Sequence, residues 1–523
     1  MSGGENTPGS DWLLAVVPRR GRVPDSFHPA LLGYLDLPER EALAGISEGT
    51  PILISPRLEH DRDLIRYFNT GSEFVGLNAA TRESEGREIR IWLEFLESQG
   101  VHWRDVVSQH FTDFRRVRTD PDVVRELIRT GAMAARAGRL PVVTTATFAK
   151  GHFALRRLYK WAVAQRLIRS SPVPEQVIHG ARVAKSGPRK QQWLMPATYQ
   201  LWRNVGLGGH ALERGSDGRL SWGMPDPSWK GGVNSGRNQA FADLMITSAL
   251  RRREQSTLLE EELPAPGHDS RLASAVAKFN RSRVFTLNPD VLTQVARYQR
   301  LHRGAAVRRA QQAGRYEALA SRTDLLVLDG LRRERGAVIF VAETGEEISL
   351  DRADQNQRAR MFRRDSRGEL EPMMLWLTEA GRPMPPRGWN DVFEAADRRV
   401  ASALQRINAA EECPQVNPHV LRFTFALYLL AALHRRIDER EGYRETEAYD
   451  WRRYGAAYGV VQDMLGHKSE ETTVNTYLEP VRGLRQASLF DSTVGMSLAE
   501  VIGVLTQGSE RVMRVGSVFG DVE

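Results

Sequence analysis

The sequence has little cysteine, no long apolar run and no recognisable leader, and each absence narrows the class of protein. Cys413 is the only cysteine among 523 residues, which excludes an internal disulfide and a cysteine-cluster metal site and fits a reducing compartment. The longest apolar stretch, residues 423–433, falls short of the roughly 18 residues that span a bilayer. Residues 1–10 lack the basic and apolar regions of a signal peptide. We therefore expect a soluble, cytoplasmic protein that does not interact with membranes.

Tandem repeats, long low-complexity blocks and a glycine-rich phosphate loop are also absent from the sequence. What is present is a basic chain with a hydrophobic content of 41%, which is enough to build real cores. Lys and Arg number 73 against 65 for Asp and Glu, giving a formal charge of +8. This balance favours a polyanion such as nucleic acid over a membrane surface. The length suggests about two to four domains.

Residues 1–74 mix glycine, proline and charge, and we expect an N-terminal extension of unclear fold there. From 75 to 182 the pattern is helical, with Ile89, Trp92, Leu93 and Leu96 spaced as one apolar face. A further helix is expected over 147–167, whose basic side chains are Lys150, Arg156, Arg157 and Lys160. These side chains could contact DNA phosphates or form an ordinary solvated face, and the sequence leaves both readings open.

A basic linker at 184–191 leads to a second domain, expected over 190–487. We expect insertions near 205–235, 305–370 and 434–458. The first is rich in glycine, which suggests irregular structure, and the second is highly charged and weakly periodic, which argues against a core of its own. A helix is predicted over 241–259, and a two-stranded hairpin turning around Asn280 and Arg281. The basic run 358–367 is interpreted as a solvated face rather than a DNA contact. The tail, 488–523, could pack on its own domain or on a neighbouring copy.

Residues suited to phosphodiester chemistry are scattered over this second domain. Breaking and rejoining such a bond without a metal requires cations for the non-bridging oxygens, a nucleophile, and an acid for the leaving oxygen. Arginine suits the first task because it binds bidentately and stays charged. The candidates are Arg251, Lys278, Arg283, His419, Arg422, His467 and Tyr477. Each is weak alone, and a buried tyrosine with a satisfied hydroxyl is the ordinary alternative for Tyr477.

Their order is more specific than any one of them. The segments are Ser248-Ala-Leu-Arg-Arg-Arg-Glu254, Lys278 with Arg283 and Val-Phe-Thr-Leu, Pro418-His-Val-Leu-Arg422-Phe-Thr-Phe-Ala, and Leu465-Gly-His467 followed by Tyr477. In this order they resemble the boxes of the tyrosine recombinase (phage integrase) family, and residues 75–175 look like its helical core-binding domain. Three features depart from the family pattern: Ala249 replaces a common glycine, Phe423 a common histidine, and one extra residue precedes Tyr477. Among the three consecutive arginines, the positions of Leu250 and Glu254 favour Arg251.

The resemblance implies a mainly α fold with a small β-sheet (α+β), made of a core-binding domain and a catalytic domain. It implies that Tyr477 attacks the scissile phosphate and leaves a 3′-phosphotyrosyl bond and a 5′ hydroxyl. Arg251 and Arg422 would bind the phosphate, Lys278 would protonate the 5′ oxygen, and His419 would accept the phenol proton. His467 would hydrogen-bond the phosphate and Glu254 would orient its neighbours. Arg283 is expected among the DNA-contacting residues, and no metal or other cofactor is implied.

The expected partner is duplex DNA with specific sites, recombined by a homotetramer through a Holliday junction in the nucleoid. The insertions favour an integrase of a mobile element, and whether an accessory DNA-bending or directionality factor takes part is left open. A non-catalytic DNA-binding protein on the same fold is the alternative from another class. A type IB topoisomerase or a telomere resolvase would share the chemistry.

Overall fold

The computed structural model describes residues 12–17, 49–77, 79–129, 142–176, 191–215, 220–229, 231–321, 324–334, 337–409, 413–441, 451–467, 473 and 512–515. The chain divides into two compact units, Met1–Ser186 and Gly187–Glu523. Each has its own hydrophobic core. The protein is mainly α-helical with small sheets, which confirms the expected fold class. In the described parts of the chain, no helix is both long and apolar enough to cross a membrane.

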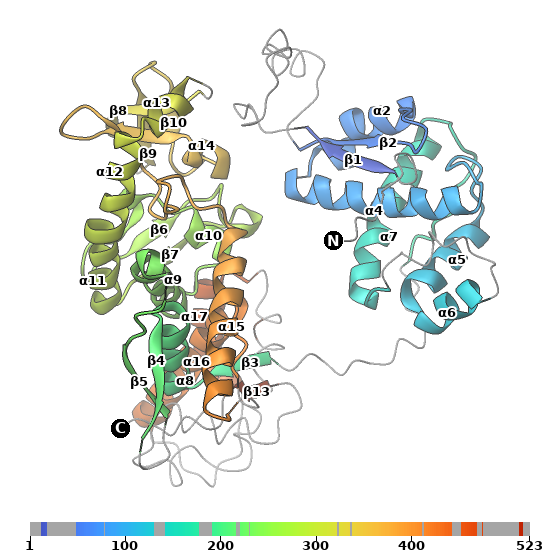
Figure 1. The fold of residues 1–523 in the computed structure, drawn as a ribbon. Coiled ribbons are helices and arrows are strands. Elements are labelled where there is room, and N and C mark those ends of the chain that lie inside the picture. Colours follow the sequence, from blue (N-terminus) through green and yellow to red (C-terminus); the bar gives the residue numbers. More distant parts are fainter. Residues whose placement is uncertain are drawn as a thin grey trace. The chain divides into compact units, whose positions relative to one another are not determined.

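The first unit is a helical bundle with a two-stranded sheet (Figure 1). Its elements are β1 (Leu13–Val16), β2 (Pro51–Ile54), α2 (Arg62–Thr70), α3 (Ser72–Val75), α4 (Ala79–Ser98), α5 (Ser108–Thr119), α6 (Pro121–Arg129) and α7 (Thr145–Ala164). The predicted apolar face of α4 is buried, as expected. Trp92 on this face donates to the Tyr159 hydroxyl of α7 at 2.9 Å, which ties the two long helices together. Trp12 and Leu53, from the segment expected to be an extension, belong to the same core.

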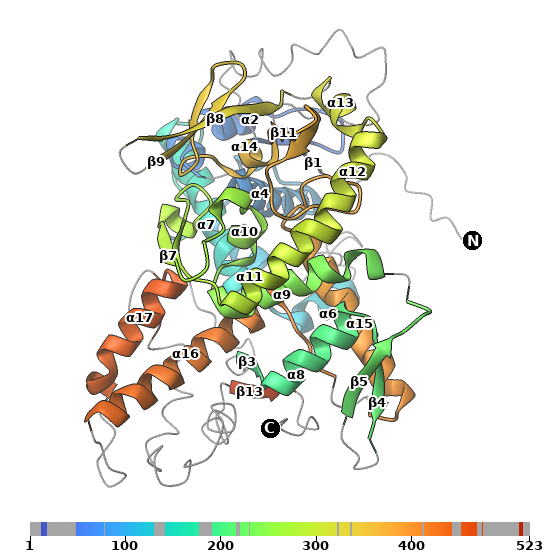
Figure 2. The same cartoon turned by 90° about the vertical axis from the view of Figure 1, so that its left-hand side faces the viewer.

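The second unit contains the remaining helices (Figures 1 and 2). The α-helices are α8 (Pro196–Leu201), α9 (Ser235–Ser248), α10 (Arg252–Ser256), α11 (Pro289–Tyr298), α12 (Gly304–Gln312), α13 (Arg315–Ala320), α14 (Gln355–Ala359), α15 (Gly388–Arg406), α16 (Pro418–Glu441) and α17 (Gly455–Leu465). Two π-helical segments, η3 (Trp202–Leu207) and η7 (Gln299–Arg303), extend α8 and α11, and short 3₁₀ turns are η4 (Gly232–Asn234), η5 (Glu260–Glu262), η6 (Lys278–Asn280) and η9 (Trp451–Tyr454). The core of this unit centres on aromatic rings, with Phe241 stacked on Trp389 at 3.5 Å between ring centroids.

The strands of the second unit form one larger sheet and three pairs. The larger sheet has the order β10 (Glu347–Ser349), β9 (Ala337–Ala342), β8 (Leu326–Glu334), β11 (Met361–Arg364), β12 (Leu370–Pro372). The pairs are β4 (His210–Arg214) with β5 (Leu220–Pro225), β6 (Ser270–Leu272) with β7 (Arg283–Phe285), and β3 (Gln191–Leu194) with β13 (Val512–Val515). The last pair is parallel, so the one described segment of the tail joins its own unit.

The charged stretch near 305–370 has a core of its own, contrary to the sequence-based expectation. Tyr316 of α13, Phe340 of β9, and Met361 and Phe362 of β11 are buried in one hydrophobic cluster. The apolar residues are divided among short strands separated by charged turns, so no sustained period was visible in the sequence. The segment is a packed module rather than a coreless insertion.

The basic run 358–367 is only in part the solvated face that we expected, because Arg364 and Arg367 are exposed but Arg358 and Arg363 are paired within the fold. Arg358 is fully buried and its guanidinium donates to both carboxylate oxygens of Glu262, at 2.6 and 2.8 Å. Arg363 donates to Glu260 at 2.9 Å and to Glu261 at 2.7 Å. These arginines join β11 and α14 to the acidic turn η5, a long-range pairing that a charge count cannot show.

Three local predictions also need correction. The helix expected over 241–259 is interrupted between α9 and α10. The expected hairpin exists as β6 and β7, with Ser270 opposite Phe285, but Lys278 lies in the 3₁₀ turn η6 between them rather than in a strand. The Gly-rich stretch near 205–235 contains the β4–β5 hairpin and is not irregular throughout.

Candidate active site

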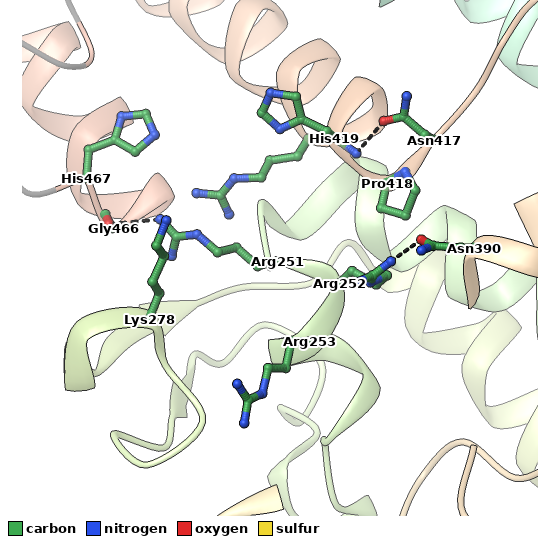
Figure 3. A pocket seen from close by; sticks show the side chains of 11 residues that line it. Arg251, Arg252, Arg253, Lys278, Asn390, Asn417, Pro418, His419, Gly466 and His467 are labelled. Carbon is green, nitrogen blue, oxygen red and sulfur yellow. Dashed lines mark hydrogen bonds between the residues drawn. The ribbon is translucent and has the colours of Figure 1, made fainter. Parts of the chain in front are cut away.

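A cavity of about 800 Å³ in the second unit brings most of the predicted catalytic residues together. It is lined by Arg251, Arg252, Arg253, Lys278, Asn390, Asn417, Pro418, His419, Arg422, Gly466 and His467 (Figure 3). Five of the six predicted catalytic residues are in this set. Tyr477 lies outside the described residues. The described residues that line the cavity therefore come from five segments that are separated in the sequence.

The corner between α9 and α10 directs Arg251 into the cavity. Ala249 ends α9 in the left-handed conformation, with φ 56°, and Arg251 caps α10 with an extended backbone. This conformation costs a residue with a side chain about 1–2 kcal/mol of free energy, whereas it costs glycine almost none. The geometry thus explains why a glycine is common here in the family that the motif resembles.

Glu254 is a buried anion that holds two arginines and the turn that presents the lysine. It accepts from the Arg251 backbone amide at 2.7 Å, from Arg251 Nη1 at 2.9 Å, from Arg283 Nη1 at 3.2 Å, and from the Lys278 amide at 3.3 Å. Burial raises the pKa of the carboxyl, but the hydrogen bond and charge of Arg283 and the charge of Arg251 outweigh it and lower the pKa to about 2. Glu254 is therefore ionised at neutral pH, and it holds Arg251, Arg283 and the Lys278 turn in place.

The start of α16 places His419 and Arg422 one turn apart on the same face. Asn417 caps this helix, because its side-chain oxygen accepts from the amides of His419 at 2.9 Å and Val420 at 3.1 Å, and Pro418 occupies the first turn. Arg422 is 6% exposed. Its guanidinium donates to the carbonyls of Ala249 and Leu465, at the ends of α9 and α17. Burial and the Arg422 charge lower the pKa of His419.

The end of α17 positions His467. Gly466 has φ 59°, its amide donates to Asp463 and the amide of His467 donates to Gln462, both at 3.1 Å, which is a Schellman-type helix end. Arg251 Nη2 donates to the Gly466 carbonyl at 3.0 Å. The ring of His467 is 2.9 Å from the Thr473 hydroxyl through Nδ1. Burial, then the nearby charges of Arg422, Arg251 and Lys278, lower the pKa of His467 to about 4, so the imidazole is neutral at pH 7.

The sequence analysis missed four of the lining residues as site components: Arg252, Arg253, Asn390 and Asn417. The two arginines were considered only as alternatives to Arg251, although the three side chains point in different directions (Figure 3). Arg252 donates to Asn390 Oδ1, and Arg253 donates to Gln355 Oε1 at 3.1 Å. Nothing in the sequence distinguishes Asn390, which reaches the cavity because the start of α15 lies next to the start of α10. The Asn-Pro start of α16 was the available signal for Asn417.

The four basic residues predicted on α7 are partly neutralised by acids of their own unit. Lys150 is exposed, but Arg157 pairs with the buried Glu85, and Lys160 pairs with Glu73. Arg156 donates to a backbone carbonyl at 3.0 Å. This face is less cationic than a count of its side chains indicates.

Arg283, also predicted to contact DNA, is largely buried and pairs with Glu254. Its side chain is 7% exposed and its guanidinium donates to Glu254, which leaves it little surface for a DNA backbone. The physical reason is the position of Glu254, which draws both neighbouring guanidinium groups inward. We propose that Arg283 keeps Glu254 ionised and in place.

Neither a family model nor a curated protein matches the chain. Among solved structures, it is similar to the Tn1549 transposon integrase in complex with a circular intermediate DNA, with 14% identity over 77% of this chain and 90% of that chain and a TM-score of 0.39. It is similar to the XerH site-specific recombinase bound to a palindromic difH substrate, with 11% identity over 88% and 90% and a TM-score of 0.40. The integrase from mycobacterium phage Brujita has 14% identity over 86% and 95% and a TM-score of 0.22. All three are integrases or recombinases, the class that the sequence motifs resemble.

Proposed function

We propose that this protein is a tyrosine-type site-specific DNA recombinase. The observation that supports the proposal best is the convergence of Arg251, Lys278, His419, Arg422 and His467 on one cavity. Four arginines and a lysine line that cavity, and no carboxylate is among the eleven described residues that line it. Such a site suits a phosphodiester, because guanidinium groups match its non-bridging oxygens and stay charged.

In this proposal, Arg251 and Arg422 hold the scissile phosphate. Both are already anchored, Arg251 by Glu254 and the Gly466 carbonyl, and Arg422 by two carbonyls at helix ends. Anchored donors need no reorganisation as charge develops on the phosphate, which is the main source of electrostatic catalysis. By analogy with an oxyanion donor, loss of one such contact costs about 2.7–4 kcal/mol of transition-state stabilisation.

In the proposed reaction, each proton has a donor and an acceptor. Tyr477 Oη forms a bond to phosphorus while the bond from phosphorus to the 5′ oxygen breaks; the phenol proton passes to His419, and Lys278 gives a proton to the 5′ oxygen. His419 suits a base because its lowered pKa keeps it neutral at pH 7, whereas a phenol with a pKa of about 10 is protonated there. Thr473 engages Nδ1 of His467, so Nε2 is the nitrogen that we assign to the phosphate.

The finer expectations belong to the same proposal. The energy of the broken bond is kept in the phosphotyrosine, so rejoining to a new 5′ hydroxyl requires no ATP. We propose that residues 75–182 contact duplex DNA, that four protomers act on two sites through a Holliday junction, and that the element served is mobile. We also propose that the tail packs on its own protomer, which the pairing of its described strand β13 with β3 supports.

The test is the trapping of a covalent protein–DNA adduct. The substrates are duplexes from the DNA on both sides of the coding gene. Each is nicked so that the cleaved fragment with the free 5′ hydroxyl diffuses away. They are incubated with the wild-type protein and with Tyr477→Phe. An adduct that resists denaturation is expected with the wild type alone. An adduct formed by Tyr477→Phe would refute the assignment of the nucleophile.

The same assay separates the alternatives. Tight, specific binding by the wild type without an adduct on any nicked duplex would favour a non-catalytic DNA-binding protein. Relaxation of supercoiled DNA without site preference would favour a type IB topoisomerase, and covalently closed hairpin ends would favour a telomere resolvase.

A further inference from the structure

The cavity is larger than the proposed catalytic residues require. Lys278 and His467 lie on one side of it, whereas Arg252, Asn390 and Asn417 lie on the side of Pro418 (Figure 3). A single phosphate held by Arg251 and Arg422 leaves this second side unexplained.

Arg252 is oriented but not neutralised. Its Nη1 donates to the neutral Asn390 side chain, and the guanidinium is half-buried. Burial and the nearby positive charge of Arg387 lower the pKa of Arg252, so two cations approach each other here. In the described parts of the chain, neither arginine pairs with a carboxylate. Arg363, another partly buried arginine of this unit, does pair with one, Glu260.

Two like charges held together without a counter-ion are unfavourable unless an anion joins them. The anion available beside a scissile phosphate is the next phosphate of the same strand. Arg251 has an extended backbone, with φ −73° and ψ 151°, and Arg252 is the first residue of α10, so their side chains diverge. Divergence of consecutive arginines suits two successive phosphates better than one.

We propose that Arg252, oriented by Asn390 and accompanied by Arg387, binds the backbone phosphate adjacent to the scissile phosphate. The inference rests on the proposed function, because it requires DNA in this cavity. The sequence left open which of the three consecutive arginines acts in the site. In this proposal two of them do, because Arg251 binds the reacting phosphate and Arg252 binds its neighbour.

The test pairs protein variants with DNA that carries one neutral methylphosphonate. Binding is measured on the Tyr477→Phe background, with a duplex selected by binding from a random pool, and each phosphate of the bound strand is neutralised in turn. The phosphate assigned to Arg251 is the one whose neutralisation causes no further loss of binding in Arg251→Ala. With Arg252 intact, neutralising a phosphate next to that one should weaken binding roughly tenfold to a hundredfold, as expected for a charge-assisted contact. With Arg252→Ala, binding to unmodified DNA should be weaker by the same factor, and that methylphosphonate should cause no further loss.

Arg253→Ala is the matched control, since Arg253 is exposed, lines the same cavity and bonds to Gln355. It should keep the full sensitivity to the methylphosphonate. Asn390→Ala, which retains the charge of Arg252, should lose less affinity than Arg252→Ala. The slope of log affinity against log salt concentration should fall by about one phosphate contact only when Arg252 is removed. Full methylphosphonate sensitivity in Arg252→Ala would overturn the inference.

Failure of this inference and failure of the proposed function are distinguishable. The binding cycle does not use Tyr477, so an error in the nucleophile leaves it intact. A chain that selects no duplex from the pool would overturn both. Arg252→Gln provides a second variant should Arg252→Ala fold poorly, and the same loss of sensitivity is expected.

Discussion

Replacing Glu254 by glutamine should destabilise the second unit strongly at neutral pH, and this destabilisation should be lost in acid. The carboxylate is 1% exposed and serves Arg251 and Arg283 together. A carboxyl whose pKa falls from 4.5 to about 2 on folding contributes about 3 kcal/mol at pH 7. Breaking a buried ion pair by removing one partner costs about 3–5 kcal/mol. The two figures agree, and we expect Glu254→Gln to lose about 3–5 kcal/mol.

The pH dependence follows from the direction of the pKa change. Because folding lowers this pKa, the contribution is fully present above 4.5 and is lost as the pH falls from 4.5 toward 2. The difference in unfolding free energy between wild type and Glu254→Gln should therefore be constant from pH 7 to about 5 and shrink at about pH 4 and below. Urea unfolding followed by tryptophan fluorescence measures it.

Glu343→Gln is the control from the same unit. Glu343 pairs with Arg364 by two hydrogen bonds, but its side chain is 39% exposed, so the pair is screened by solvent. Exposed pairs contribute about 0–1 kcal/mol, and Glu343→Gln should stay within that range. A loss below about 1 kcal/mol for Glu254→Gln, or a loss that does not change between pH 7 and about 4, would refute the account of Glu254 as a buried anchor.

Three further predictions concern the helix ends and the base. Ala249→Val should lose about 2–3 kcal/mol of stability because a branched side chain is strained at φ 56° in a fully buried site, whereas Ala249→Gly should stay within about 1 kcal/mol of wild type; thermal unfolding of both checks this. Gly466→Ala should reduce adduct formation even with saturating DNA. The reason is that φ is 59° at this position and the added Cβ would lie 3.2 Å from Arg283 Nη1 and 3.5 Å from Arg251 Nη1. A normal single-turnover rate would contradict this prediction. Single-turnover cleavage should lose rate on acidification only below about pH 6.5, since burial and Arg422 lower the pKa of His419, and an inflection above that pH would exclude His419 as the base.

Much of the helical framework could be predicted from the sequence because its signals are local. The face of α4 that contains Trp92 was visible as a repeat, and the Asn-Pro pair before His419 marks the start of α16. The residues that resemble the family boxes were found through their order along the chain. Five of those residues line one cavity.

What could not be predicted depends on pairing across long sequence distances. Arg358 was interpreted as solvated because its partner, Glu262, lies 96 residues away. Asn390 enters the cavity only through the packing of α15, and Arg283 turns inward only because Glu254 is buried nearby. Periodicity and charge counts contain no information about such partners.

The anchoring contacts suggest why the four boxes must occur together. The first box supplies Arg251 and also the Ala249 carbonyl that holds Arg422 of the third box. The fourth box supplies His467 and also the carbonyls of Leu465 and Gly466, which hold Arg422 and Arg251. The first and fourth segments thus each contribute both a group that we assign to the phosphate and an anchor for another segment's group. Substitutions in different boxes should consequently be non-additive, because residues that share one hydrogen-bonded network couple by about 0.5–3 kcal/mol.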